Sequence, residues 1–293
     1  MVSLKRMGLD KQTRSPLVRV GRPLSVGRVR ADDLRSSEPT GYGAYLTVRA
    51  PAGAAAARAP VDALAERLGL RNEFGGGADA GAGAVAFLRR VRATPGDVDD
   101  DDLLAAGAVV HVAAPEAETV SRFCAELERL LAPAVAPRVM SGVARPPSYT
   151  GDEMHNFAYA HRALQQPGDA MPNAFLLPMS KTAAWWSKDW MERHTYFLPR
   201  YDGGRMVSEG HALAAAPAID SIVRRTYKSP ELPARAGTYE FLNHFECADP
   251  DVDTFHAVCA RLRDFDRNPE WAYVREGPLW HGTRVATWPE LFA

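Results

Sequence analysis

The chain runs twice through one order of strand-like and helix-like segments, and this order restricts the folds open to it. In the first half, apolar residues at helical spacing predict helices at 59–70 and 116–133. Alternating or short apolar runs predict strands at 41–50, 84–93, 106–114 and 137–146. The first half therefore follows a β-α-β-β-α-β order, the plan of a ferredoxin-like unit.

The second half repeats this plan with more irregular segments. A helix is predicted at 185–200, ending before a proline, followed by a helical stretch at 206–220 and an amphipathic helix at 251–265. Strands are predicted at 174–180, 221–230 and 238–248, with a strand pair or bent strand at 270–285. We therefore expect an α+β protein in which two ferredoxin-like (βαββαβ) halves form a single unit.

The domain boundaries follow from this reading. Residues 1–37 are polar and basic and form an N-terminal arm in our interpretation. Residues 38–146 would make the N-terminal ferredoxin-like half, and residues 174–293 the C-terminal one. Residues 147–173 connect the two halves.

Composition excludes several classes of function. The net charge is −1, with 46% hydrophobic and 24% charged residues, so we expect neither a nucleic-acid partner nor a membrane partner. Three cysteines without a C-x-x-C spacing argue against a disulfide framework or a structural zinc site. The N-terminus has no apolar signal-peptide core, and no run of eighteen apolar residues occurs. We expect a cytoplasmic protein.

Sequence motifs of common catalytic sites are absent. No G-x-G-x-x-G, P-loop, H-E-x-x-H or G-x-S-x-G motif stands at a usable place, and the acidic run at 96–102 lacks the spaced ligands of a calcium loop. What remains is His211, with Arg224 thirteen residues later. A lone histidine in an alanine-rich helix is ordinarily a surface or core residue, so the pair needs further support.

Three pieces of the C-terminal half, in the same order, resemble the chlorite dismutase superfamily, which includes coproheme decarboxylases. The first is "PMSKTAAWW" (178–186), with Arg193 seven residues after its second tryptophan. The second is the spacing of His211 to Arg224, followed by "RTY". The third is "LRDFDRNPEWAYVREGPLWHG" (262–282). The resemblance covers roughly residues 174–285 and implies a chlorite dismutase-like dimeric α+β barrel.

The resemblance implies a heme b site and assigns residues to it. His211 matches the proximal iron ligand, and Arg224 the distal arginine that would hold an anionic oxidant. An acid accepting the second imidazole N–H would raise the basicity of His211. Asp266 best matches this acid by its place after "LR", and Glu270 is the competing candidate, because this chain has extra residues between Asp266 and Tyr273. The heme edge or its propionates would be lined by Lys181 and by Trp185 or Trp186.

The sequence also departs from the family. Leu177 stands where coproheme decarboxylases carry their catalytic tyrosine, so we do not expect that activity. The segment 194–210 is longer than in typical chlorite dismutases, which makes the shape of the pocket and a small oxyanion substrate doubtful. We expect a heme-dependent oxidoreductase that acts on an oxidant or small organic substrate. The alternative is a heme-free binding or scaffold protein. The family also implies a homo-oligomer whose N-terminal half binds no cofactor.

Overall fold

The computed structural model describes residues 41–49, 57–72, 83–91, 103, 105–132, 138–144, 171–218, 221–228 and 239–293. The expected basic arm (1–37), the acidic run (96–102) and nearly all of the connecting segment (147–173) lie outside these residues. The domain boundaries named above therefore stay a prediction.

The N-terminal half forms the strands and helices that the hydrophobic pattern predicts. Apolar residues recur at helical spacing in α3 and α4, whose buried side chains all face the sheet. One further element, the two-residue strand β2, pairs in parallel with β3. The elements are β1 (Gly41–Arg49), α3 (Val61–Arg67), β2 (Arg71–Asn72), β3 (Ala84–Arg90), β4 (Ala106–Ala114), α4 (Ala117–Leu131) and β5 (Arg138–Ala144).

The C-terminal half repeats the plan with additions between its first two long strands. Its sheet is built from β6 (Asn173–Lys181), β9 (Ile222–Lys228), β10 (Phe241–Cys247), β11 (Val274–Glu276) and β12 (Trp280–Val285). Its helices are α6 (Ala183–Trp186), α7 (Trp190–Thr195), α8 (Gly210–Ala215) and α9 (Val252–Arg263). Short 3-10 turns are η4 (Ala216–Ala218), η5 (Asp249–Asp251), η6 (Pro269–Tyr273) and η7 (Pro289–Phe292).

The strands of the two halves close into a barrel. Within the described residues, neighbours follow the order β10-β9-β5-β1-β4-β3-β12-β6, and β6 pairs back with β10. The halves meet at two joints, β5 with β9 and β12 with β3. A closed ring of strands leaves none of these backbones as an open edge. The expected α+β barrel of two ferredoxin-like halves is confirmed.

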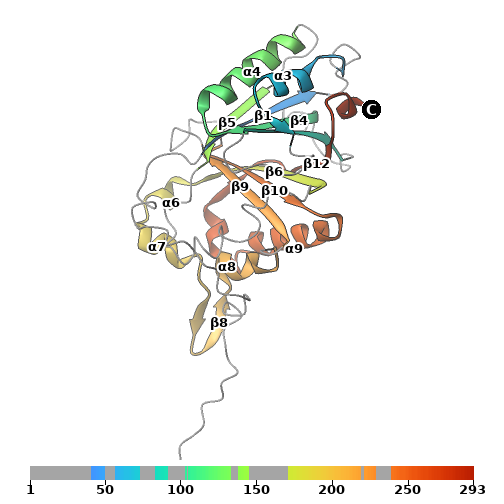
Figure 1. The fold of residues 1–293 in the computed structure, drawn as a ribbon. Coiled ribbons are helices and arrows are strands. Elements are labelled where there is room, and N and C mark those ends of the chain that lie inside the picture. The colour runs from blue at the N-terminus through green and yellow to red at the C-terminus, as the bar shows by residue number, and fades with distance from the viewer. Residues whose placement is uncertain are drawn as a thin grey trace, which may run out of the picture. The chain divides into compact units, whose positions relative to one another are not determined.

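Side-chain alternation along each strand separates the barrel interior from its outer faces. The interior holds Tyr45, Leu88, Leu176, Tyr227 and Trp280 among others. The outer face of the first half packs under α3 and α4, which cover it in Figure 1. The outer face of the second half packs against α9 in a cluster of Phe175, Ile222, Cys247, Phe255 and Cys259. The helices α8 and α9 lie together on that side (Figure 1).

The barrel interior also contains two buried tyrosine–histidine pairs. The Tyr45 hydroxyl lies 2.7 Å from Nδ1 of His244, and the Tyr227 hydroxyl lies 2.9 Å from Nε2 of His111. Each pair joins a strand of one half to a strand of the other. The Tyr45 and His111 rings also stack, with centroids 4.6 Å apart. Polar contacts therefore hold the two halves together inside an otherwise apolar core.

The predicted helix at 185–200 is wrong in its extent, because two short helices stand there. Thr182 caps α6, and Asp189 accepts a hydrogen bond from the Glu192 amide at 2.8 Å and so starts α7 anew. A side-chain oxygen that satisfies a free amide at this place favours a helix start over continuation.

The predicted helical stretch at 206–220 is wrong in its first part. Gly203 and Gly204 both have positive φ, 54° and 81°, and turn the chain between β7 (Arg200–Asp202) and β8 (Arg205–Ser208). The helix begins only at Gly210. The β7–β8 hairpin projects from the other elements of the C-terminal half (Figure 1).

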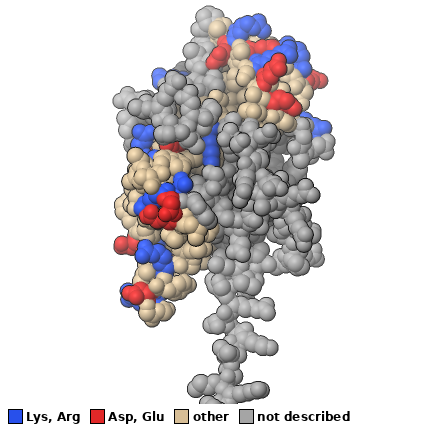
Figure 2. All heavy atoms as spheres, turned by 90° about the vertical axis from the view of Figure 1, so that its left-hand side faces the viewer, with Lys and Arg blue, Asp and Glu red and all other residues tan. Residues whose placement is uncertain are grey.

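The surface shows mixed charge. On the face drawn in Figure 2, basic and acidic side chains lie in small interspersed groups. This agrees with the net charge of −1. Within the part of the chain that the structure describes, no helix is long and apolar enough to cross a membrane.

Candidate functional site

His211 lies in the first turn of α8, and its position is set by Gly210. Gly210 has φ 66°, a conformation that favours glycine, and a Cβ there would lie 2.5 Å from the Leu198 carbonyl oxygen. The Gly210 amide donates to the carbonyl of Arg267 at 3.1 Å, and the His211 amide donates to the carbonyl of Tyr196 at 3.1 Å. The helix start is therefore fixed on both sides by backbone contacts.

The carboxylate of Glu270 partners the His211 side chain. Nδ1 of His211 lies 3.0 Å from Oε2 of Glu270, and the Glu270 side chain is only 3% exposed. If the imidazole is neutral, Nδ1 donates to the carboxylate and Nε2 remains the ring's acceptor, the tautomer that a metal-ligating histidine needs. Asp266, the other candidate, is exposed in the turn after α9. Of the two acids, the structure brings Glu270 to His211.

The other oxygen of Glu270 pairs with Lys181. Nζ of Lys181 contacts Oε1 of Glu270, and both side chains are buried. Burial acts to raise the pKa of Glu270, but the charges of Lys181 and His211 and their hydrogen bonds outweigh it and hold this pKa at about 2. Burial also lowers the pKa of Lys181, against the opposing effect of Glu270. The carboxylate next to His211 is thus ionised at neutral pH.

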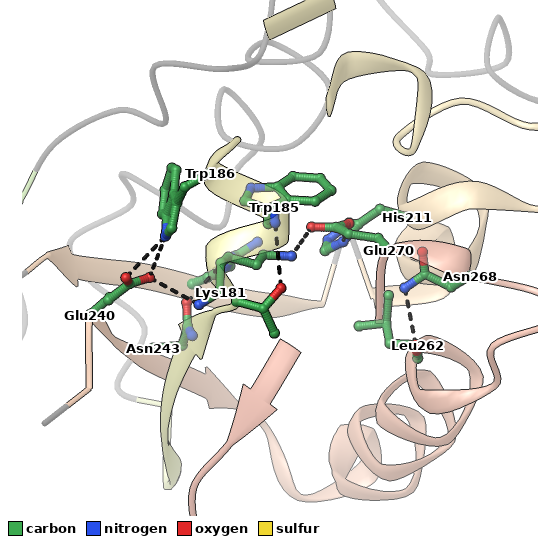
Figure 3. Close-up of polar contacts among 11 residues, drawn as sticks. Lys181, Trp185, Trp186, His211, Glu240, Asn243, Leu262, Asn268 and Glu270 are labelled. Atoms are coloured by element: carbon green, nitrogen blue, oxygen red, sulfur yellow. Dashed lines mark hydrogen bonds and ion pairs between the residues drawn. The ribbon is translucent and has the colours of Figure 1, made fainter. Parts of the chain in front are cut away.

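The two tryptophans lie on either side of Lys181, in different environments. The Lys181 ammonium stands 4.3 Å from the centroid of the fully buried Trp185 ring. The Trp186 indole donates to the Glu240 carboxylate at 3.0 and 3.1 Å, and Glu240 also accepts the Lys181 backbone amide at 2.9 Å. Figure 3 shows Lys181 between Glu240 and Glu270, with His211 beyond Glu270. A chain of polar contacts therefore runs from Trp186 to His211.

Arg224 lies on β9, on the sheet face that α9 covers. Strand alternation places it on the same side as Ile222, which packs in the cluster under α9. Nη2 of Arg224 donates to Oδ1 of Asn243 at 3.2 Å, and its guanidinium stands 5.9 Å from the centroid of the Phe245 ring. The outer face of the C-terminal sheet therefore carries a cation whose direction is set by contacts to β10.

Asn243 spans three strands of this face. Its Oδ1 also accepts the Thr226 hydroxyl at 2.9 Å, and its Nδ2 donates to the Leu177 carbonyl at 3.4 Å. The amide nitrogen of Asn243 points to β6. Its amide oxygen therefore faces β9, where it accepts hydrogen bonds from Arg224 and Thr226. Asn243 is 1% exposed and Leu177 is 2% exposed. Residue 177 is a leucine, so the position on β6 next to Asn243 carries an alkyl side chain and no phenol.

Sequence reasoning missed several residues of the site. Asn243 and Glu240 lie on or next to a strand that alternates cleanly, and nothing in that alternation separates a pocket residue from a packed one. The Tyr196–Tyr273 hydroxyl pair joins segments 77 positions apart, at 3.2 Å. Sequence spacing favoured Asp266 over Glu270 as the acid beside His211, and this preference is wrong, because Glu270 contacts His211 and Asp266 is exposed.

The residues brought together fit a heme. An imidazole whose Nδ1 lies against a buried carboxylate is a common arrangement for a histidine that ligates iron. A permanent cation on the sheet face that α9 covers would suit an anionic group bound at such an iron. The residues of this site therefore agree with the heme that the sequence resemblance implies.

Comparison with known proteins gives matches in structure alone. No protein-family model and no curated protein sequence matches the chain. Chlorite dismutase from Candidatus Nitrospira defluvii in complex with imidazole matches with a TM-score of 0.60 and 20% identity, over 89% of this chain and 97% of that one. A variant of the same protein in complex with cyanide matches with a TM-score of 0.59 and 19% identity, over 89% of this chain and 96% of that one.

A further chlorite dismutase-like protein matches with a TM-score of 0.59 and 14% identity, over 87% of this chain and 98% of that one. These likenesses extend over both halves of the chain. They show that it has the chlorite dismutase fold, as the sequence resemblance predicted.

Proposed function

We propose that this chain is a heme-dependent oxidoreductase of the chlorite dismutase-like group. In this proposal His211 of α8 would supply the iron ligand of heme b, and Arg224, on the outer face of the C-terminal sheet, would bind the oxidant. The observation that carries the proposal is the buried contact of His211 with Glu270, itself paired with Lys181. An ionised carboxylate with 3% exposure beside a helix histidine has a clear purpose if that histidine ligates a metal.

Each residue has a distinct task in this mechanism. When bound, the heme supplies an iron that exchanges electrons with an oxygen-bearing oxidant. Glu270 holds the Nδ1 proton of His211 and so keeps Nε2 available and basic. Lys181 keeps Glu270 ionised. Arg224 would attract an anionic or polarised oxidant and would stabilise negative charge on it.

Asn243 supports Arg224 in this reaction. Its amide oxygen accepts from the guanidinium while its nitrogen is bound to the Leu177 carbonyl. An arginine held in this way needs less reorientation when the substrate arrives. The substrate we propose is a small oxidant such as peroxide, or a small organic oxygen or nitrogen compound. The alkyl side chain of Leu177 argues against coproheme decarboxylation, since no phenol is available there to be oxidised.

Heme titration of the purified protein tests the proposal. Hemin added to the wild-type protein is expected to give a Soret band that saturates at one heme per chain. The substitution His211→Ala should abolish or strongly shift this band, because it removes the iron ligand. His194→Ala is the matched control, since His194 lies in α7 and is half-buried like His211.

Two results would count against a heme enzyme. One is a wild-type protein that gives no Soret band. The other is a His211→Ala spectrum identical to that of the wild type and of His194→Ala. Either would favour the alternative, a heme-free binding or scaffold protein that keeps the fold.

A further inference from the structure

Two tyrosines that the proposed reaction does not use form a pair near the surface. Tyr196 follows the last residue of α7, and Tyr273 ends η6. Their hydroxyl oxygens are 3.2 Å apart, and their rings meet edge to face with centroids 5.5 Å apart. Both side chains are half-buried, so they are in reach of solvent. Tyr196 belongs to the segment 194–210, which lengthens this chain relative to typical chlorite dismutases.

The pair connects inward to the residues around His211. The ring of Trp185 lies with its centroid 5.4 Å from that of Tyr196 and 5.7 Å from that of Tyr273. Trp185 is fully buried beneath the ammonium of Lys181, which pairs with Glu270. A second connection is shorter, because the carbonyl of Tyr196 accepts the backbone amide of His211 at 3.1 Å. Aromatic rings in contact, together with hydrogen bonds, are efficient conductors of single electrons.

The surroundings of the pair act differently on the two phenols. The ammonium of Lys188 stands 4.9 Å from the Tyr273 ring centroid and 5.6 Å from that of Tyr196. Hydrogen bonds from Tyr196 and from Lys188 lower the pKa of the Tyr273 phenol, whereas burial raises the pKa of Tyr196. When an electron leaves Tyr273, the Tyr196 hydroxyl oxygen, 3.2 Å away, can accept the phenol proton.

We propose that Tyr196 and Tyr273 form a surface oxidation site, which takes single electrons from phenolic reductants too bulky to reach the heme. In each step a phenol outside the protein loses one electron and one proton and becomes a phenoxyl radical. The electron passes through the tyrosine pair and Trp185 to the heme site, and the proton goes to water. Two such electrons and two protons reduce one hydrogen peroxide, the oxidant, to two waters.

This proposal rests on the proposed heme function, and it adds to it a reductant and the place where the reductant is oxidised. A tyrosine pair that only packs α7 against η6 would give the same ring contacts. The two roles differ in whether an unpaired electron resides on the pair after the protein meets peroxide.

Hydroxyl deletions separate the two roles. The variants are Tyr196→Phe, Tyr273→Phe and the double variant, each of which keeps the ring. Tyr201→Phe is the matched control, because Tyr201 lies in the same inserted segment and is 62% exposed, on β7 of the projecting hairpin. The heme-loaded proteins are mixed with hydrogen peroxide and freeze-quenched. Electron paramagnetic resonance then detects the tyrosyl radical, and spin-trap adducts are located by mass spectrometry.

The wild type and Tyr201→Phe are expected to give a tyrosyl signal with adducts on Tyr196 or Tyr273. The double variant should lose this signal while its Soret band and thermal unfolding stay unchanged. Tyramine linked to dextran, which is too large to enter the protein, serves as the bulky phenol. Its peroxide-dependent coupling should be lost in the double variant, whereas free tyramine should still be oxidised.

The outcomes distinguish this inference from the function on which it rests. If the wild-type protein gives no Soret band, both the heme function and the surface oxidation site are contradicted. A heme protein whose spectrum depends on His211, but whose tyrosyl signal and dextran-tyramine coupling persist in the double variant, overturns the surface site and leaves the heme function standing.

Discussion

At the scale of single residues, Glu270 joins the two parts of the polar network next to His211. It accepts from His211 through one oxygen and pairs with Lys181 through the other, and it is almost entirely buried. A buried charge with one partner removed is costly, whereas a buried pair replaced as a unit is not. The energetic role of Glu270 is therefore separable from its proposed role toward a heme.

The substitution Glu270→Gln is expected to destabilise the protein by roughly 3–5 kcal/mol, because it leaves the Lys181 ammonium buried without its anion. Adding Lys181→Met should recover much of this loss. The midpoint of unfolding in urea measures both. Recovery of stability without recovery of the wild-type reduction potential of the bound heme would show that Glu270 acts on His211. If the double variant is as unstable as Glu270→Gln, the loss of stability does not come from an unpaired Lys181.

The pKa of Glu270 predicts how stability depends on acid. This pKa lies at about 2 in the folded protein, below the ordinary value of 4.5 for a glutamate. A carboxyl with a depressed folded pKa stabilises the protein above its unfolded pKa and loses that contribution as the pH falls toward its folded pKa. We expect the free energy of unfolding to fall between about pH 5 and pH 2.

Glu270→Gln supplies the control for this acid dependence, since its side chain does not titrate. The steepness of the fall should be smaller in this variant than in the wild type. The free energy of unfolding of both proteins is measured by chemical unfolding from about pH 5 to pH 2. If it falls equally steeply in the two, the lowered pKa of Glu270 is contradicted.

At the scale of elements, the start of α8 depends on one backbone conformation. Gly210 combines a positive φ with a contact to Leu198 that leaves no room for a Cβ. Gly204 also has a positive φ, 81°, but a Cβ at this position would meet nothing within 4 Å. A substitution at Gly204 therefore tests conformational strain alone, whereas one at Gly210 tests strain together with steric overlap.

Gly210→Ala is expected to cost several kcal/mol, because left-handed strain adds to a clash with backbone that must move. Gly204→Ala should cost only about 1 kcal/mol, the strain alone. Thermal unfolding measures both, and heme titration should show weaker binding in Gly210→Ala alone, since His211 follows directly. Similar losses in the two variants would mean that the Leu198 contact has no energetic weight.

The sequence predicted helices and strands correctly where apolar residues recur at a single spacing, helical or alternating, along the whole element. The helix α4 and the strand β4 agree with their predicted ranges to within a few residues. The prediction failed between residues 185 and 220, where single polar or glycine residues decide the structure. Asp189 restarts a helix, and the Gly203–Gly204 turn makes a hairpin of a segment that reads as helical. Long-range partners such as Glu270 and His211 needed the fold itself, because three-dimensional closure brings them together.

At the scale of the whole molecule, the two tyrosine–histidine pairs inside the barrel join its halves. His244 additionally lies with Nε2 3.1 Å from Oε1 of Glu246, whose other oxygen pairs with Arg284 at 2.9 Å. These side chains are buried, so a lost hydrogen bond is not replaced by water. The expected homo-oligomer stays a prediction for a measurement of mass in solution.

Tyr45→Phe is expected to lower the free energy of unfolding by roughly 1–3 kcal/mol, because it deprives buried His244 of a hydrogen-bond partner. Tyr42→Phe, on the same strand but with its ring against the α3–α4 core, should change it by less than about 0.5 kcal/mol. Far-UV circular dichroism and tryptophan fluorescence should report a single shared transition in both. If Tyr45→Phe and Tyr42→Phe have the same unfolding midpoint, the Tyr45–His244 hydrogen bond does not contribute to stability.

The closed ring of strands makes each half the binding partner of the other. Among the described residues each half offers two strand edges, and the halves meet along them at the β5–β9 and β12–β3 joints. In thermodynamic terms the fold is an intramolecular heterodimer, and chain continuity supplies a high effective concentration for its association. If the two halves were produced as separate chains, dilution would therefore control assembly. The proposed heme site, although its residues all come from the C-terminal half, would form only at concentrations where the N-terminal half is bound.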